Sequence, residues 1–223
     1  MDKFNYYKSA KRSSGRQELS PVAELNILNA AKRVFYRKGL YGARMQEIAD
    51  EAGINKAMLH YYFKSKDKLF DAVFEEASES FFPKIVQYIN ADLPLFEKIE
   101  YFVENYIDLL LKNPEIPSFI ITEMHHNPDR IKKLFSEKGL TISNKLINDI
   151  SKAVSEGKIN PIAPVQLMLN IISLCIFPIA AKPMVRTITN KDENEYIKLI
   201  ESRKKEVSKF IISAIKIHDD EIN

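Results

Sequence analysis

Three short runs of apolar residues at helical spacing lie close together between residues 27 and 70. Apolar side chains that recur every three or four residues predict one buried face of a helix. Gly39 and Gly53 follow the first and second runs, and glycine is the residue that most often ends a helix. The stretch therefore predicts three short helices that are joined by tight turns and packed against one another.

The second and third of these helices are predicted to differ in what they expose. The second has a single apolar stripe that begins at Met45, whereas the third spans residues 56–62 and can be capped by Asn55. In the third helix Leu59 belongs to the apolar side, and the opposite side is basic, small and aromatic. Such side chains reach phosphates and base edges in a DNA major groove. Two short helices of this kind across a tight turn predict a helix-turn-helix.

The same stretch resembles the TetR family of bacterial regulators. The resemblance rests on the turn at Gly39 and on the segments Ile48-Ala49, Ala52-Gly53-Ile54, LHYYF at 59–63 and KSKDKL at 64–69. Together with the exposed face of the third helix, it implies a set of residues that contact DNA. We expect these contacts from Arg44, Asn55, Lys56, Ala57, Met58, His60, Tyr61, Lys64 and Lys66.

One departure from the family pattern concerns the start of the second helix. The family places two hydroxyl residues where this chain has Ala43 and Arg44, and a hydroxyl there caps the helix and contacts the DNA backbone. Loss of such a cap costs roughly 0.5–2 kcal/mol. We expect Glu47 to offset part of this cost through the helix dipole, and Arg44 to contact a phosphate by its charge.

Charge is distributed unevenly along the chain. The net charge is only +3, but residues 1–70 carry 14 Lys and Arg against 7 Asp and Glu, and the remainder carries 19 against 23. A basic end that coincides with the helix-turn-helix indicates that this end meets a polyanion. Residues 1–19 are predicted to be a flexible basic arm, which either lies along the DNA or is a solvated tail or vector-derived remnant.

The rest of the chain predicts an all-α protein in which this three-helix head is joined to a larger helical body. Prolines, glycines and capping residues mark the ends of six further helices, and no segment alternates as a strand does. We expect an arm at 1–19, a DNA-binding domain at 20–70, and a helical effector-binding and dimerisation domain at 71–223. The further helices are predicted at 65–90, 94–114, 116–126, 127–157 with a bend at Gly139, 164–181 and 192–216.

The resemblance also implies partners. In the family the last two helices of each subunit form a four-helix dimer interface, so a homodimer would bind a near-palindromic double-stranded operator. A small molecule, which the aromatic content suggests is apolar or aromatic, would bind in the body and release the DNA. Prolines 114, 117 and 178 are predicted to interrupt helices and leave room for it. The expected ligand-lining residues are Phe102, Tyr106, Phe119, Met124, His125 and Phe177.

Other classes of function find less support. Glu123 and His126 supply only two metal ligands, Cys175 lies in an apolar run, and no nucleophile with a base is evident, so we predict no enzyme, metal or cofactor. The uncharged stretch 159–181 contains Asn, Gln and Pro, which disfavour a membrane span. We expect a cytoplasmic repressor; the alternative is a ligand-independent architectural DNA-binding protein, whose body would have a solid core.

Overall fold

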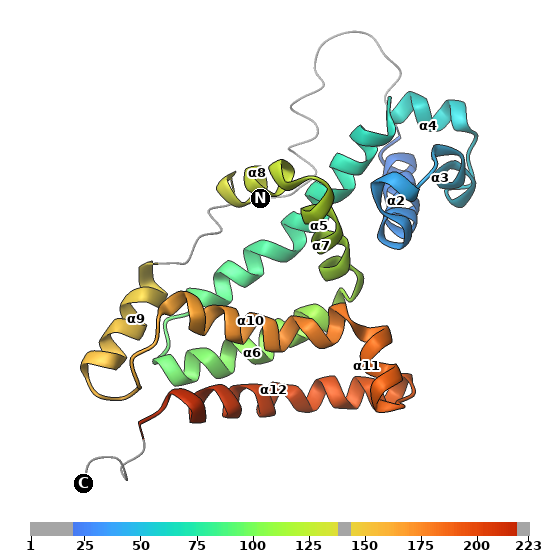
Figure 1. Ribbon diagram of the computed structural model, residues 1–223. Helices are drawn as coiled ribbons and strands as arrows, with labels where there is room; N and C mark the ends of the chain where they lie inside the picture. The colour runs from blue at the N-terminus through green and yellow to red at the C-terminus, as the bar shows by residue number, and fades with distance from the viewer. Residues whose placement is uncertain (1–19, 138–143, 218–223) are drawn as a thin grey trace.

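The computed structural model describes residues 20–137 and 144–217, and every regular element within these ranges is a helix. Figure 1 shows a small head at one end of the long helix α5 and a larger body at the other. This arrangement confirms the predicted all-α class. The helices are α2 (Pro21–Gly42), α3 (Met45–Glu51), α4 (Lys56–Tyr62), α5 (Lys66–Ile89), α6 (Leu95–Lys112), α7 (Glu115–His126), α8 (Pro128–Glu137), α9 (Asn144–Ser155), α10 (Pro164–Ala180), α11 (Lys182–Thr189) and α12 (Glu193–Ile215).

The head consists of α2, α3 and α4, packed around a fully buried apolar core that includes Phe35, Ile48 and Leu59. Regular α2 is interrupted at Gly39, which has φ 65° and ψ −177°. This positive φ favours glycine because it has no Cβ. Helical geometry resumes for a short turn as far as Gly42, three residues beyond the predicted end.

The body is built around α6, α10 and α12, which contact one another and lie side by side in Figure 1. Residues at i, i+3, i+4 and i+7 of α6 are buried, as the amphipathic pattern predicts. Helix α5 connects the body to the head, and the Ser65 hydroxyl caps it by accepting a hydrogen bond from the Lys68 amide at 3.2 Å. Because α5 begins before residue 70 and runs to Ile89, it belongs to both parts of the molecule.

Two stretches differ from the sequence prediction. The segment predicted as one bent helix at 127–157 contains two helices, α8 and α9, and the bend expected at Gly139 lies outside the described residues. Helix α11 was not predicted at all, because its eight residues are partly β-branched and contribute no buried side chain. Its only clear sequence signal is Pro183 in the first turn, a position that proline favours.

The prediction that Pro178 interrupts a helix is wrong, because α10 continues through it. A proline has no amide hydrogen, so the carbonyl of Leu174 loses its helical partner. The Arg203 guanidinium of α12 replaces that partner and donates to the Leu174 carbonyl at 2.6 Å. Pro117 likewise lies within α7, near its start, and only Pro114 stands outside a helix, as the residue before α7.

The length and hydropathy of a helix decide whether it can span a membrane. Within 20–137 and 144–217, no single helix is long and apolar enough to cross a membrane. Among the described helices, α10 and α11 taken together have the length and composition of a span, but they are bent by 77° relative to each other.

Candidate nucleic-acid interface

Helix α4 is held in the head by one side and exposes the other. The side chain of Asn55 caps it, with Oδ1 accepting a hydrogen bond from the Met58 amide at 2.7 Å. Leu59 is fully buried, whereas the predicted contact residues of this helix are exposed. A short helix that is capped at its start and anchored at its centre can present a fixed set of side chains to a ligand. The exposed residues are Lys56, Ala57, Met58, His60 and Tyr61.

The two tyrosines of α4 play different structural parts. Tyr62 is half-buried against the core of the head, and its ring meets that of Tyr61 edge to face at a centroid distance of 5.8 Å. Tyr61 is 54% exposed. Because an edge-to-face contact orients both rings, Tyr62 restricts the direction in which Tyr61 projects from the helix.

Lys64 and Lys66, which follow α4, are placed differently. Lys64 is exposed, but Lys66 is half-buried and its Nζ donates a hydrogen bond to the Ala43 carbonyl at 3.1 Å. Lys66 therefore ties the start of α5 to the loop between α2 and α3. Its ammonium group has further donors, so this bond does not preclude a phosphate contact.

Arg44 stands at the N-cap of α3 with extended backbone dihedrals, φ −119° and ψ 139°, and its side chain makes no capping hydrogen bond. The structure thus confirms that the cap is missing. We expect Arg44→Ser to raise the free energy of unfolding by roughly 0.5–2 kcal/mol, because a serine hydroxyl at an N-cap accepts a backbone amide of the first turn. Chemical denaturation measures this change. Arg44→Ala is the control, since it removes the same charge without supplying a cap; equal stability of the two variants would contradict the prediction.

Ion pairs that the sequence did not suggest join α2 to α3. Glu47 Oε1 lies 2.8 Å from Arg37 Nη2, and Glu47 Oε2 lies 2.8 Å from Lys38 Nζ. One turn further along α3, Glu51 Oε1 lies 2.7 Å from Arg33 Nε. The hydrogen bonds from Lys38 and Arg37 lower the pKa of Glu47, so its carboxylate is ionised at neutral pH. No sequence signal identified these pairs, because their partners are 9 to 18 residues apart.

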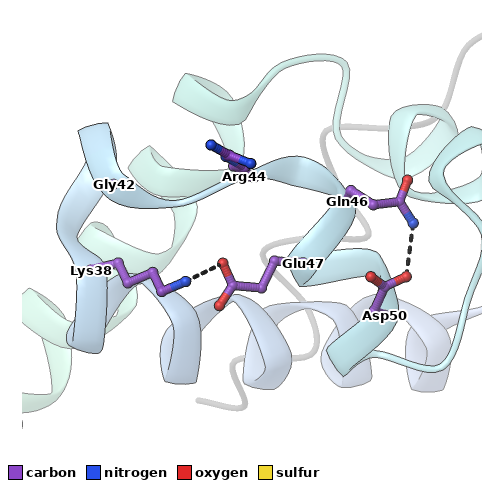
Figure 2. A pocket seen from close by; sticks show the side chains of 6 residues that line it. All are labelled: Lys38, Gly42, Arg44, Gln46, Glu47 and Asp50. Carbon is purple, nitrogen blue, oxygen red and sulfur yellow. Dashed lines mark hydrogen bonds and ion pairs between the residues drawn. The ribbon is translucent and has the colours of Figure 1, made fainter.

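Beside these pairs the head has a hollow that adjoins the start of α3. Figure 2 shows the side chain of Lys38 pointing to Glu47, and that of Gln46 donating a hydrogen bond to Asp50. Arg44 stands apart from both pairs in this view. The hollow therefore combines cationic, amide and acidic groups in one place. Its lining residues are Lys38, Gly42, Arg44, Gln46, Glu47 and Asp50.

The six residues expected to line a ligand site fall in different surroundings. Phe102 and Tyr106 are buried in α6 with ring centroids 5.2 Å apart, and burial raises the pKa of Tyr106 above its usual range. Phe119 is also buried, but its ring contacts belong to the junction with the head. The remaining three are exposed in a single chain and do not join the buried rings: Met124, His125 and Phe177.

Phe70 is the centre of the junction between head and body. Its ring centroid lies 5.0 Å from that of Phe35 in the head and 5.3 Å from that of Phe119 in α7. The guanidinium of Arg130 in α8 covers the same ring at 4.9 Å and pairs with Asp71 at 2.9 Å. A displacement of α7 or α8 would therefore act directly on the end of α5 that carries the head.

Groups that could suggest catalysis or metal binding have other roles in the structure. Glu123 is buried and forms an ion pair with Arg130, while His126 packs on Tyr41 at a ring distance of 5.3 Å. Burial raises the pKa of the Cys175 thiol to about 12, so it carries no thiolate at neutral pH. In the part of the chain that the structure describes, no three His, Cys, Asp or Glu residues are grouped to hold a metal.

Two sequence profiles together cover most of the chain. Residues 27–73 match the one described as bacterial regulatory proteins, tetR family. Residues 96–211 match the one described as tetracyclin repressor-like, C-terminal domain. The first range contains α3 and α4, and the second contains α10 and nearly all of α6 and α12.

Individual proteins with similar sequences and structures are transcriptional regulators by name. The repressor NicS of Pseudomonas putida is 30% identical over 158 residues, which cover 68% of this chain and 73% of NicS. The regulator RutR of Escherichia coli K12 is 25% identical over 219 residues, covering 93% and 97% of the two chains. The crystal structure of HlyIIR, a hemolysin II transcriptional regulator, aligns with a TM-score of 0.56 at 25% identity over 88% of this chain and 98% of that one.

Proposed function

The chain belongs to the tetR family of bacterial regulatory proteins, and we propose that it represses transcription by binding a near-palindromic operator as a homodimer. The observation that carries the proposal is the exposed surface of α4, where Lys56, His60 and Tyr61 are open to solvent while Leu59 is buried in the core. A basic and aromatic helix face of this kind contacts phosphates and base edges. Release of the operator would follow when a small molecule binds the body.

The dimer is proposed to form through α10 and α12. Val165, Leu169 and Phe177 project from α10 on the side away from its buried residues, and they are 42%, 47% and 54% exposed. Phe210 on α12 is 65% exposed and lies two turns after Arg203, which contacts α10. Apolar side chains clustered on adjacent helices are typical of a protein interface. A two-fold dimer through this face would hold two α4 helices about one DNA turn apart.

The effector is proposed to bind among the buried aromatic rings of the body, near Phe102 and Tyr106. Sites for small molecules are mostly apolar with a few polar groups, which favours an apolar or aromatic compound. Such a ligand can shift the protein only by its difference in affinity between two arrangements of the heads. We propose that the rings around Phe70 transmit this shift to α5, because they contact the head and the body at once.

The reading role of α4 predicts different effects for its charged and aromatic residues. Lys56→Ala is expected to leave the head folded and to make the salt dependence of operator binding shallower by about one unit per half-site, because one phosphate contact is lost. Tyr61→Ala is expected to change which operator bases are preferred. Fluorescence anisotropy at several salt concentrations measures the first effect, and selection from a random DNA library measures the second.

Lys112→Ala is the control, because Lys112 is an exposed lysine at the end of α6 in the body. It is expected to leave affinity, salt slope and base preference unchanged. Folded Lys56→Ala and Tyr61→Ala proteins that match the wild type in all three would show that α4 is not the reader.

The family assignment argues against catalysis, because its named relatives are regulators. We place the protein in the cytoplasm, where bacterial operators lie. An architectural DNA-binding protein remains the competing proposal, with a body that only dimerises. Screening small molecules for one that weakens operator binding separates the two, because only the repressor has an effector.

A further inference from the structure

The carboxylate of Glu47, which lines the hollow beside α3, forms ion pairs with two basic side chains. Each of its carboxylate oxygens lies 2.8 Å from one of them, Oε1 from Arg37 and Oε2 from Lys38. The two side chains are 56% and 43% exposed, so both could reach an anion in solution if Glu47 released them. Arg44 lines the same hollow, is exposed and has no capping role.

The hollow also lies where DNA is expected under the proposed function. The first helix of a helix-turn-helix crosses the DNA backbone while the second enters the major groove. In this chain the first helix is α3, and Arg44 and Gln46 stand at its beginning. Gln46 donates to Asp50 at 2.8 Å, and the same amide can donate to a phosphate oxygen instead.

We propose that this hollow receives a backbone phosphate of the operator, and that Glu47 limits operator affinity by competing with this phosphate for Lys38, which lines the hollow. The inference rests on the proposed function and adds the residues that tune it. To bind Lys38, the phosphate must displace the carboxylate of Glu47, so in the wild type this contact is made only in part. The carboxylate of Glu47 then repels the phosphate, because both are anionic and share one hollow.

The ion pairs of Glu47 also join α3 to α2, so they could serve only to hold the two helices together. Glu51 provides the matched comparison: it lies one turn further along α3 and pairs with Arg33 on α2 at 2.7 Å, yet it does not line the hollow. If Glu47 and Glu51 serve only to join α3 to α2, replacing either one should change operator affinity in the same way. If Glu47 competes with DNA, only its removal should strengthen operator binding.

The experiment compares Glu47→Gln with Glu51→Gln in the full chain, using an operator selected by the wild type and a series of salt concentrations. Glu47→Gln is expected to bind on the order of tenfold tighter, with a salt slope steeper by about one unit per half-site, because a freed cation adds a phosphate contact. Glu51→Gln is expected to leave both quantities near their wild-type values. Combining Lys38→Ala with Glu47→Gln should remove most of the gain.

Thermal unfolding of each variant shows whether it is folded, so that a change in operator affinity is not confused with a loss of structure. Equal gains for Glu47→Gln and Glu51→Gln would show a general charge effect and overturn the inference. Unchanged or weaker operator binding by a folded Glu47→Gln protein would also overturn it and leave the ion pair a purely structural one. In both cases the wild type still binds its operator and the proposed function stands, whereas a wild type that selects no DNA overturns the two together.

Discussion

Replacement of Leu59 by alanine is expected to lower the free energy of unfolding by roughly 2–5 kcal/mol, because it leaves a cavity in a close-packed core. Leu59 is fully buried and is the only buried residue within α4, so no other side chain of this helix can compensate. DNA binding should be lost in proportion to the fraction of unfolded heads. Chemical denaturation followed by circular dichroism measures the change.

Leu59→Met is the control, since it keeps most of the buried volume and should cost less than about 1.5 kcal/mol. At a temperature where the Leu59→Ala head remains folded, its operator affinity should approach that of the wild type. A folded Leu59→Ala protein that has nevertheless lost its affinity would contradict the division of α4 into a core side and a reading side.

Leu169→Asp is expected to convert the proposed homodimer into a monomer. Leu169 is 47% exposed in one chain, so the monomer should fold normally, but in the proposed dimer the aspartate would be a buried charge without a partner. A monomer contacts only one half-site, and operator affinity should then fall by on the order of a thousandfold, toward that of non-specific binding. Light scattering measures the mass, and anisotropy measures the affinity.

Leu169→Met preserves the apolar contact and should retain the wild-type mass and affinity. If Leu169→Asp remains a dimer at micromolar concentration, the interface does not include this face of α10. If the wild type itself is a monomer under the same conditions, the proposed homodimer is wrong.

The helices of the head could be predicted from the sequence because their signals are local. Asn55 caps α4 and Ser65 caps α5, as expected. In both cases the side-chain oxygen accepts a hydrogen bond from the backbone amide of the residue three positions later. The direction of Leu59 followed from helical spacing alone. The missing cap at Arg44 was likewise visible from the residue type, and the structure confirms it.

Features that depend on tertiary contacts could not be predicted in this way. The pairing of Glu47 with Arg37 and Lys38 requires the angle between α2 and α3, which no local pattern specifies. The continuation of α10 through Pro178 depends on Arg203, 29 residues after the carbonyl that it satisfies. For the same reason the aromatic stripe of the body could not be divided into core, junction and surface from spacing alone.

Selection of DNA from a random duplex library by the wild-type protein tests the central claim most directly. The account predicts one enriched sequence with two half-sites related by two-fold symmetry, about one helical turn apart, and bound by two chains. Enrichment of a single asymmetric site bound by one chain, or no enrichment over random duplex at any salt concentration, would contradict it.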